Sequence, residues 1–260
     1  MSEASHTPVR VELIGGPTAV IDLGGLRFVT DPTFDAPGEH TSGTSTLTKL
    51  TGPSKLPHEL GPVDAVLLSH DQHADNLDDA GRAFLDTVPR IFSTTAAAER
   101  IGEVVTGLAP WQRTTITRPN GDDLHITAVP AVHGPDGSAA STGPVIGFVL
   151  HGEELPSVYV SGDNASLRVV EEVAHHLGPI TYALLFGGGA RVSRIDAYLT
   201  LTSDQLPAAT NILAAKRVVP VHSEGWAHFT QDHDSVRRAF AASDVDDRLV
   251  LLEPGEAAEL

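Results

Sequence analysis

AVLLSHDQHADNLD, residues 65–78, joins a short apolar run to the densest cluster of histidine and aspartate in this 260-residue chain. Its first four residues are a continuous apolar run of the kind that fills a buried strand. The run ends at Ser69, and His70, His73 and Asp75 follow within the next six residues. Binding and catalytic groups are often carried on loops that a rigid scaffold holds in place. The stretch therefore predicts a buried strand that leads into a functional loop.

Three other segments repeat this arrangement of an apolar run followed by a side chain that can bind metal. His133 ends ITAVPAVH, Asp163 ends SVYVSGD, and His222 ends VVPVH. The chain has no cysteine, so a transition metal would have to be bound by imidazole and carboxylate. One such residue at a strand end is most simply a hydrogen-bonded or solvated polar group. Four residues that end strands alike predict a shared site at one rim.

Strand and helix patterns alternate along the chain. Short runs rich in β-branched residues predict strands at 9–13, 19–23, 26–30, 124–129, 145–150, 158–160, 182–186 and 218–221. Apolar residues at helical spacing predict helices after residue 76, over 166–177 and over 203–215, the last with Ser203 as its N-cap. We expect two sheets packed face to face with helices outside them. No linker separates the halves, at about 1–130 and 131–260, so the prediction is one α/β domain over 1–260.

Residues 32–62 form a long segment without a strand or helix pattern. It is full of Thr, Ser, Gly and Pro, and it has few large apolar residues. A structureless stretch of this length in a compact domain is usually functional. We therefore expect a loop or lid that shapes the choice of substrate.

Composition and charge narrow the classes of function. The chain has 17 basic and 34 acidic residues, a formal net charge of -17, which repels nucleic acid and anionic membrane surfaces. It has no apolar run of the roughly 18 residues that a membrane span needs. No secretory signal opens the chain. These features predict a cytoplasmic protein with a small-molecule substrate and no nucleic-acid or membrane partner, and they leave a homo-oligomer open.

The loop after residue 68 resembles that of the metallo-β-lactamase-fold hydrolases, whose signature is His-x-His-x-Asp-His immediately after a buried strand. Residues 24–32 look like the early strand pair of the branch that contains ascorbate-6-phosphate lactonase and the N-acylphosphatidylethanolamine phospholipase D. His133, Ser161-Gly162-Asp163 and Pro220-Val221-His222 with Gly225-Trp226 resemble its later ligand segments. The resemblance covers nearly the whole chain. It implies a four-layer αββα sandwich with a metal site at one edge of the two sheets and Asp163 as the residue that bridges two metals.

The ligand loop departs from this signature in its spacing. With one inserted residue, His70 and His73 are the paired imidazoles, which suits zinc. Without a gap, Asp71 and His73 occupy the paired positions, and the added oxygen ligand favours manganese or iron. We prefer the first alignment because His70 directly follows the strand. His73 and Asp75 are ligands in both alignments.

A second departure is Asn76, which stands where the family has histidine. An amide oxygen is a weak ligand for a transition metal, so the second ion would be held by few residues. We expect one tightly and one loosely bound ion, with Zn²⁺ preferred and manganese or iron as alternatives. The predicted metal ligands are His70, His73, Asp75, His133, Asp163 and His222.

The chemistry that these ligands imply is hydrolysis, because a bound cation lowers the pKa of a water molecule towards about 7. Asp75 would orient that water, and His228 would donate a proton to a leaving group or else cap the following loop. Asp31 would hydrogen-bond a ligand histidine or form a turn before Pro32. The predicted function is a metal-dependent hydrolase of an ester, lactone or phosphodiester. The alternatives are a metal-poor binding or regulatory protein, which Asn76 motivates, and a mononuclear iron oxygenase.

Overall fold

The computed structural model describes residues 8–42 and 45–260, and most of its strands belong to two large sheets. The first sheet contains β1 (Arg10–Gly15), β2 (Thr18–Leu23), β3 (Leu26–Thr30), β6 (Ala65–Leu67), β7 (Ile91–Thr94), β8 (Val105–Leu108) and β15 (Ala257–Glu259). The second contains β9 (Arg113–Thr117), β10 (Asp123–Pro130), β11 (Ile146–Gly152), β12 (Val158–Val160), β13 (Tyr182–Phe186) and β14 (Arg217–Val221). Their spatial orders are β15-β1-β2-β3-β6-β7-β8 and β14-β13-β12-β11-β10-β9.

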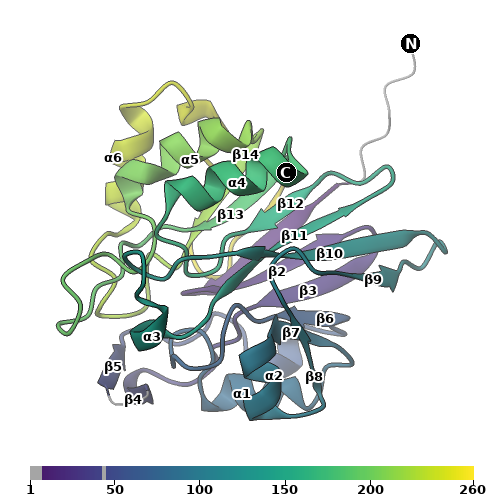
Figure 1. The fold of residues 1–260 in the computed structure, drawn as a ribbon, viewed down its shortest axis with the longest axis horizontal. Helices are drawn as coiled ribbons and strands as arrows, with labels where there is room; N and C mark the ends of the chain where they lie inside the picture. The colour runs from purple at the N-terminus through teal and green to yellow at the C-terminus, as the bar shows by residue number, and fades with distance from the viewer. Residues whose placement is uncertain (1–7, 43–44) are drawn as a thin grey trace.

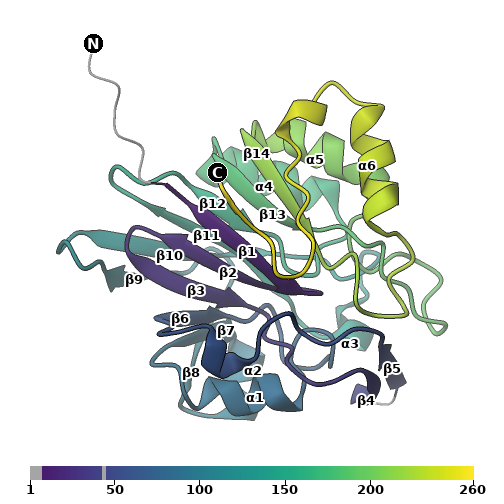
Figure 2. The same ribbon diagram turned by 180° about the vertical axis from the view of Figure 1, so that it is seen from behind.

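Helices cover the outer face of each sheet. They are α1 (Asp79–Leu85), α2 (Thr95–Ile101), α4 (Leu167–Leu177), α5 (Leu206–Leu213) and α6 (His233–Ala241), whereas the short α3 (Ala139–Thr142) lies in the connection between β10 and β11. Figures 1 and 2 show α4, α5 and α6 on the side of the second sheet and α1 and α2 beside β6, β7 and β8 of the first. The four-layer αββα sandwich is therefore confirmed. Among the described residues, no helix is both long enough and apolar enough to cross a bilayer.

Alternation along the strands explains how the layers pack. On β12, Val158 and Val160 belong to the core between the two sheets, whereas Tyr159 packs among the helices outside. On β13, Leu184 faces the inner core and Leu185 faces the helices. Successive side chains of a strand point to opposite faces, so a strand buried on both sides needs an unbroken apolar run. The unbroken apolar runs seen in the sequence therefore correspond to strands that are covered on both faces of the sheet.

Strand direction brings the predicted site residues to one edge. β12, β13 and β14 are parallel, and β10 has the same direction as β12 because both are antiparallel to β11. Their carboxyl ends therefore meet at the same edge of the second sheet. The loop after β6 joins them there, since the amide of Ile146 donates to the carbonyl oxygen of Ser69 at 3.2 Å.

The segment 32–62 contains more structure than we expected. β4 (Gly38–Ser42) pairs antiparallel with β5 (Ser45–Lys49), and a 3-10 turn, η1, covers Pro57–Glu59; residues 43–44 lie outside the described residues. The expectation of a structureless loop was wrong, because a two-stranded ribbon needs no apolar run. Lys49 holds the ribbon through a buried ion pair of 2.9 Å with Asp78, the N-cap of α1.

Two predicted boundaries also differ in the structure. The helix expected from Ser203 opens with a 3-10 turn, η2 (Ser203–Gln205), which is capped by Thr202 and Gln205 in a capping box. The sheets divide the chain near residue 110 and not near 130, because β9 and β10 belong to the second sheet and β15 returns to the first. Local patterns identify strands but do not say which sheet each strand joins.

Gly188, in the turn after β13, approaches the backbone of His222 closely. A Cβ atom at this position would lie 2.1 Å from the His222 carbonyl oxygen. We expect Gly188→Ala to lower the free energy of unfolding by about 1–3 kcal/mol through overpacking. Urea unfolding would show this as a lower midpoint at unchanged slope. The control is Gly52→Ala, where the nearest atom would be 3.6 Å away; equal midpoints for the two variants would contradict the interpretation.

Candidate metal centre

Two groups of side chains that can bind metal converge at the shared edge of the sheets. The first is His70, His73, His133 and Asp163, and the second is Asp75, Asp163 and His222. Within each group the ligand atoms lie within 4.8 Å of one another. The structure thus brings together all six residues predicted as ligands. Asp163 belongs to both groups, which is the place that a bridging ligand occupies.

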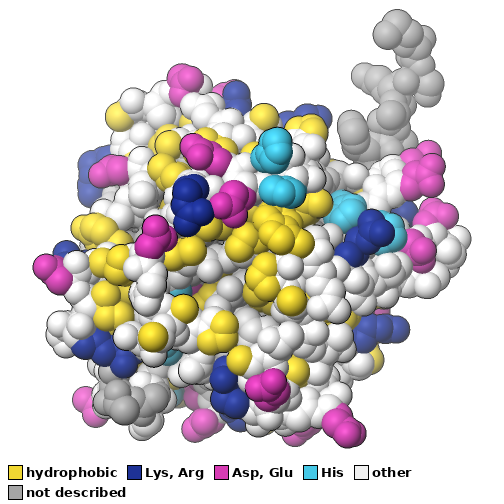
Figure 3. Space-filling view, viewed as in Figure 1, with side chains coloured by type: hydrophobic (Ala, Val, Ile, Leu, Met, Phe, Trp, Pro, Cys, Tyr) yellow, Lys and Arg dark blue, Asp and Glu magenta, His cyan; other side chains and the backbone are white. Residues whose placement is uncertain are grey.

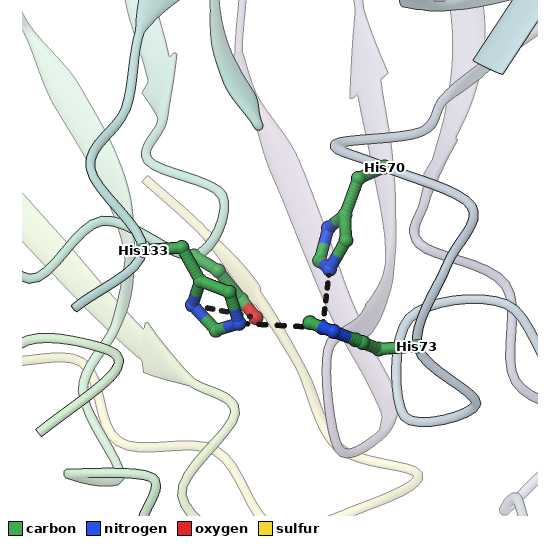
Figure 4. Close-up of side chains that lie close together, drawn as sticks. His70, His73 and His133 are labelled. Atoms are coloured by element: carbon green, nitrogen blue, oxygen red, sulfur yellow. Dashed lines mark hydrogen bonds and ion pairs between the residues drawn. The ribbon is translucent and has the colours of Figure 1, made fainter. Parts of the chain in front are cut away.

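The three histidines of the first group point toward one another, His70 and His73 from the loop after β6 and His133 from the loop after β10 (Figure 4). Nε2 of His70 lies 2.8 Å from Nδ1 of His73, which lies 3.3 Å from Nε2 of His133. Two ligand atoms on a tetrahedral zinc ion, with bonds of about 2.0–2.1 Å, are about 3.3 Å apart. The spacing of these nitrogens is therefore close to that required by one shared ion.

In His133 and His70, hydrogen bonds at Nδ1 leave Nε2, the nitrogen that faces the cluster, free to bind a metal. Nδ1 of His133 donates to the carbonyl oxygen of Leu199 at 2.7 Å, so Nε2 carries the lone pair. Nδ1 of His70 lies 3.0 Å from Oγ of Ser69, which donates to Asp31 at 2.7 Å. Such outer partners set the tautomer and direction of a ligand imidazole. Asp31 thus helps to fix the tautomer and direction of the His70 ring through Ser69.

Asp71 has a partner away from the ligand cluster. Its carboxylate accepts two hydrogen bonds from the guanidinium of Arg100, on α2. Nε donates to Oδ2 at 2.9 Å, and a terminal nitrogen donates to Oδ1. Both of its oxygens are therefore engaged, and His70 is the residue beside His73. The geometry favours the alignment with one inserted residue over the alignment without a gap.

In the second group, His222 stands between two carboxylates. Its Nε2 lies 3.2 Å from Oδ2 of Asp75 and 3.5 Å from Oδ1 of Asp163. The residue has φ +58°, a left-handed conformation that is strained for a side chain other than glycine. Its ring packs between Phe186 and Phe229, with centroids 5.2 and 4.0 Å away. Packing thus holds this histidine in place against local strain.

Asn76 has a role that the sequence did not indicate. Its side-chain nitrogen donates to Oδ2 of Asp31 and to Oδ1 of Asp163, each at 3.2 Å, and the residue is fully buried. It links two carboxylates that would otherwise repel each other. Asn76 therefore positions Asp163, the residue shared by the two groups.

Burial and neighbouring charges set the protonation of the cluster. Burial, strengthened by neighbouring histidines, lowers the pKa of His70 well below its usual range and that of His73 to about 4. For Asp75, burial opposes ionisation, but the charges and hydrogen bonds of His228 and His222 outweigh it and hold the pKa well below its ordinary value. At neutral pH, His70 and His73 are therefore neutral and Asp75 is ionised, as metal ligands must be.

The charge balance of the cluster fits a bound cation. Asp31, Asp75 and Asp163 are 1%, 3% and 0% exposed, and burial raises the pKa of Asp31 to about 7. Oδ2 of Asp163 is buried and accepts no hydrogen bond from any described residue. A buried carboxylate oxygen without a hydrogen bond is costly, and a cation beside it would remove the cost. Imidazole and carboxylate together form a donor set that zinc uses, and manganese and iron also accept it.

Bound zinc should stabilise the protein against thermal unfolding, and Asp163 should be needed for most of this effect. Zinc at about 100 times its Kd adds about 2.7 kcal/mol, which for a chain of this size raises Tm by about 5–10 °C. We expect Asp163→Asn to melt above the wild type in chelator, because one buried charge is gone, and to gain less than half of the zinc-induced rise. Calorimetry with and without zinc measures both.

The exposed Asp136, which is 83% accessible, gives the matched control. Asp136→Asn should melt like the wild type in chelator and in zinc. A full zinc-induced rise in Asp163→Asn would contradict the assignment of Asp163 to the metal centre.

Comparisons with known proteins agree with this geometry. A family model described as the beta-lactamase superfamily domain matches residues 26–223. A metal-dependent hydrolase of Pyrococcus furiosus is 26% identical over 211 residues, which are 80% of this chain and 86% of the relative.

Two solved structures share the fold. A possible metal-dependent hydrolase from Veillonella parvula superposes with a TM-score of 0.81 at 17% identity, covering 98% of this chain and 100% of that one. Isothiocyanate hydrolase from Delia radicum gut bacteria gives 0.79 at 19% identity, with coverages of 96% and 98%. None of these likenesses distinguishes the branch named from the sequence. The chain belongs to the beta-lactamase superfamily, among its metal-dependent hydrolases.

Proposed function

We propose that this metal-dependent hydrolase cleaves an ester, lactone or phosphodiester bond of a small molecule. The observation that supports this most is the pair of ligand groups joined by Asp163. Zinc is the metal we propose, since His70, His73 and His133 offer three nitrogens to one ion. When bound, the metal would supply a hydroxide at neutral pH and polarise the bond to be cleaved.

The pocket beside the ligands indicates where substrate would bind. Its walls come from the β4–β5 ribbon, the ligand loops and the segment after β13, and include Ser42, Leu47, His73, Asp75, Arg194 and His228. On the face drawn in Figure 3, the lysine and arginine side chains that the structure describes lie scattered among acidic ones. Such a surface offers a polyanion little attraction, which supports a small substrate.

Asp75 is placed to orient the attacking water. It lines the pocket, and two imidazoles fix its Oδ2, His228 at 2.9 Å and His222 at 3.2 Å. Since its pKa lies well below the usual range, it is ionised at neutral pH and can accept a hydrogen bond from water. The carboxylate would therefore orient a water molecule beside the ligand groups.

Replacing Asp75 should abolish most of the activity. We expect Asp75→Asn to lower kcat about 10²- to 10⁴-fold, because the variant keeps the shape of the side chain but loses its charge. The probes are p-nitrophenyl acetate, γ-butyrolactone and bis(p-nitrophenyl) phosphate, each assayed with zinc and with manganese. Asp79→Asn, on the exposed start of α1, is the control. Wild-type protein that hydrolyses none of the probes faster than a metal-free blank would contradict the proposal.

Asn76 does not favour the metal-poor binding protein. That alternative rested on the missing histidine, whereas the side chain here donates to two carboxylates of the cluster. The six predicted ligands remain together without it. The hydrolase therefore remains the function that the geometry supports best.

Arg194 provides a cation at the pocket. It lines the cavity with His73, and its charge contributes to the lowered pKa of that histidine. A guanidinium at this place would attract a substrate that carries a phosphate or carboxylate beside the scissile bond. We therefore propose an anionic small molecule as the preferred substrate.

Removal of Arg194 should weaken the binding of anionic substrates selectively. A hydrogen bond to a charged group contributes about 1.5–3 kcal/mol, so Arg194→Ala should raise KM for bis(p-nitrophenyl) phosphate roughly 10- to 100-fold and leave p-nitrophenyl acetate unchanged. Arg191→Ala is the control, because Arg191 is engaged by Asp196 at 2.6 Å and by the ring of Tyr198 at 5.1 Å. Equal changes in KM for both probes would contradict an anion-binding role.

A further inference from the structure

His228 lies beside the second ligand group, where it contacts Asp75, although it is absent from the family signature. Its Nε2 is 2.9 Å from Oδ2 of Asp75, the oxygen that Nε2 of His222 approaches at 3.2 Å. His222 in turn lies 3.5 Å from Oδ1 of Asp163. Two imidazole nitrogens therefore meet at one oxygen of Asp75, and one of them also approaches Asp163. These three distances are near the roughly 3.3 Å that separates two ligand atoms on a tetrahedral zinc ion.

Packing holds the ring of His228 in this direction. It stands edge-on to Phe229, with centroids 4.6 Å apart, and near Trp226 at 6.2 Å. Its carbonyl oxygen accepts from the amide of Arg191 at 3.0 Å, which ties the loop to the pocket wall. The side chain is 12% exposed, and its Nδ1 is buried without a hydrogen-bond partner among the described residues. Nε2 is therefore the nitrogen that faces the cluster.

Asn76, which stands where the signature has a ligand histidine, makes hydrogen bonds to two carboxylates instead. The side-chain nitrogen of Asn76 faces Asp31 and Asp163, so this residue supplies no nitrogen lone pair to a metal. Without a further donor, the second position has Asp75, Asp163 and His222 alone. Structural zinc sites have four protein ligands, whereas catalytic sites have three and a water molecule. A fourth ligand here would make the second position the structural one, and the hydroxide of the proposed function would then belong to the ion at His70, His73 and His133.

We propose that His228 is the fourth ligand of the second metal ion and takes the place of the histidine that Asn76 replaces. The inference rests on the metal centre of the proposed function. It gives His228 a ligand role in place of proton donation to a leaving group. It also changes the expectation of a loosely held second ion, because four protein ligands bind that ion tightly.

Metal binding, measured apart from activity, tests this assignment. Protein stripped with chelator is dialysed against buffered zinc, and bound zinc is measured by elemental analysis. We expect two equivalents on the wild type, one for each ligand group. His228→Ala should keep the first and bind the second at least about tenfold more weakly.

His40→Ala is the matched control for this experiment. The His40 ring also lies near Trp226, with centroids 5.6 Å apart, but His40 pairs with Asp35 outside the cluster. This variant should bind both equivalents as the wild type does. A second equivalent bound equally well by His228→Ala, or a wild type that binds only one, would overturn the proposal.

A nuclear magnetic resonance measurement on the wild type tests the same assignment without relying on a variant that has to fold. In protein labelled with ¹⁵N-histidine and loaded with ¹¹³Cd, each ligand imidazole shows a ¹¹³Cd–¹⁵N coupling. His70, His73, His133, His222 and His228 should be coupled, and four coupled histidines without His228 would overturn the assignment. If His228 is coupled but no probe substrate is hydrolysed, the proposed function fails and the ligand assignment stands.

Discussion

Burial of three carboxylates at one edge of the sandwich is the constraint on which the site depends. Asp31, Asp75 and Asp163 lie in the interior and share neighbours, so their charges must be compensated there. Asn76 and Ser69 supply hydrogen bonds, and His222 and His228 supply imidazoles. These groups leave Oδ2 of Asp163 without a hydrogen bond from any residue that the structure describes. Cations held by the two ligand groups would complete the compensation and would provide the reactive centre.

The two sheets make this arrangement rigid. The site residues follow strands whose ends lie at one edge, and cores on both faces of each sheet fix those ends. The β4–β5 ribbon is then attached from outside through Lys49 and Asp78. The scaffold therefore sets the ligand positions, while the ribbon and the segment with Arg194 form the pocket walls. Differences in substrate can arise in these walls without change to the metal centre.

The strands and the convergence of the candidate ligands could be predicted because both leave local signals. An apolar run marks a strand buried on both faces, and a polar residue at its end marks the rim, as for Val218 to Val221 followed by His222. The roles of Asn76 and Ser69 leave no such signal, since each depends on where Asp31 lies in three dimensions. The ribbon was missed for a related reason, because Lys49 is buried through an ion pair 29 residues along the chain and not through an apolar pattern.

The metal content of protein purified without chelator tests the central claim most directly. Elemental analysis of the wild type should find about one to two equivalents of zinc, manganese or iron. His73→Ala and Asp163→Ala should both hold less, because His73 belongs to the first ligand group and Asp163 to both. Less than about a tenth of an equivalent in the wild type, with only millimolar affinity on titration, would contradict a metal centre at this site.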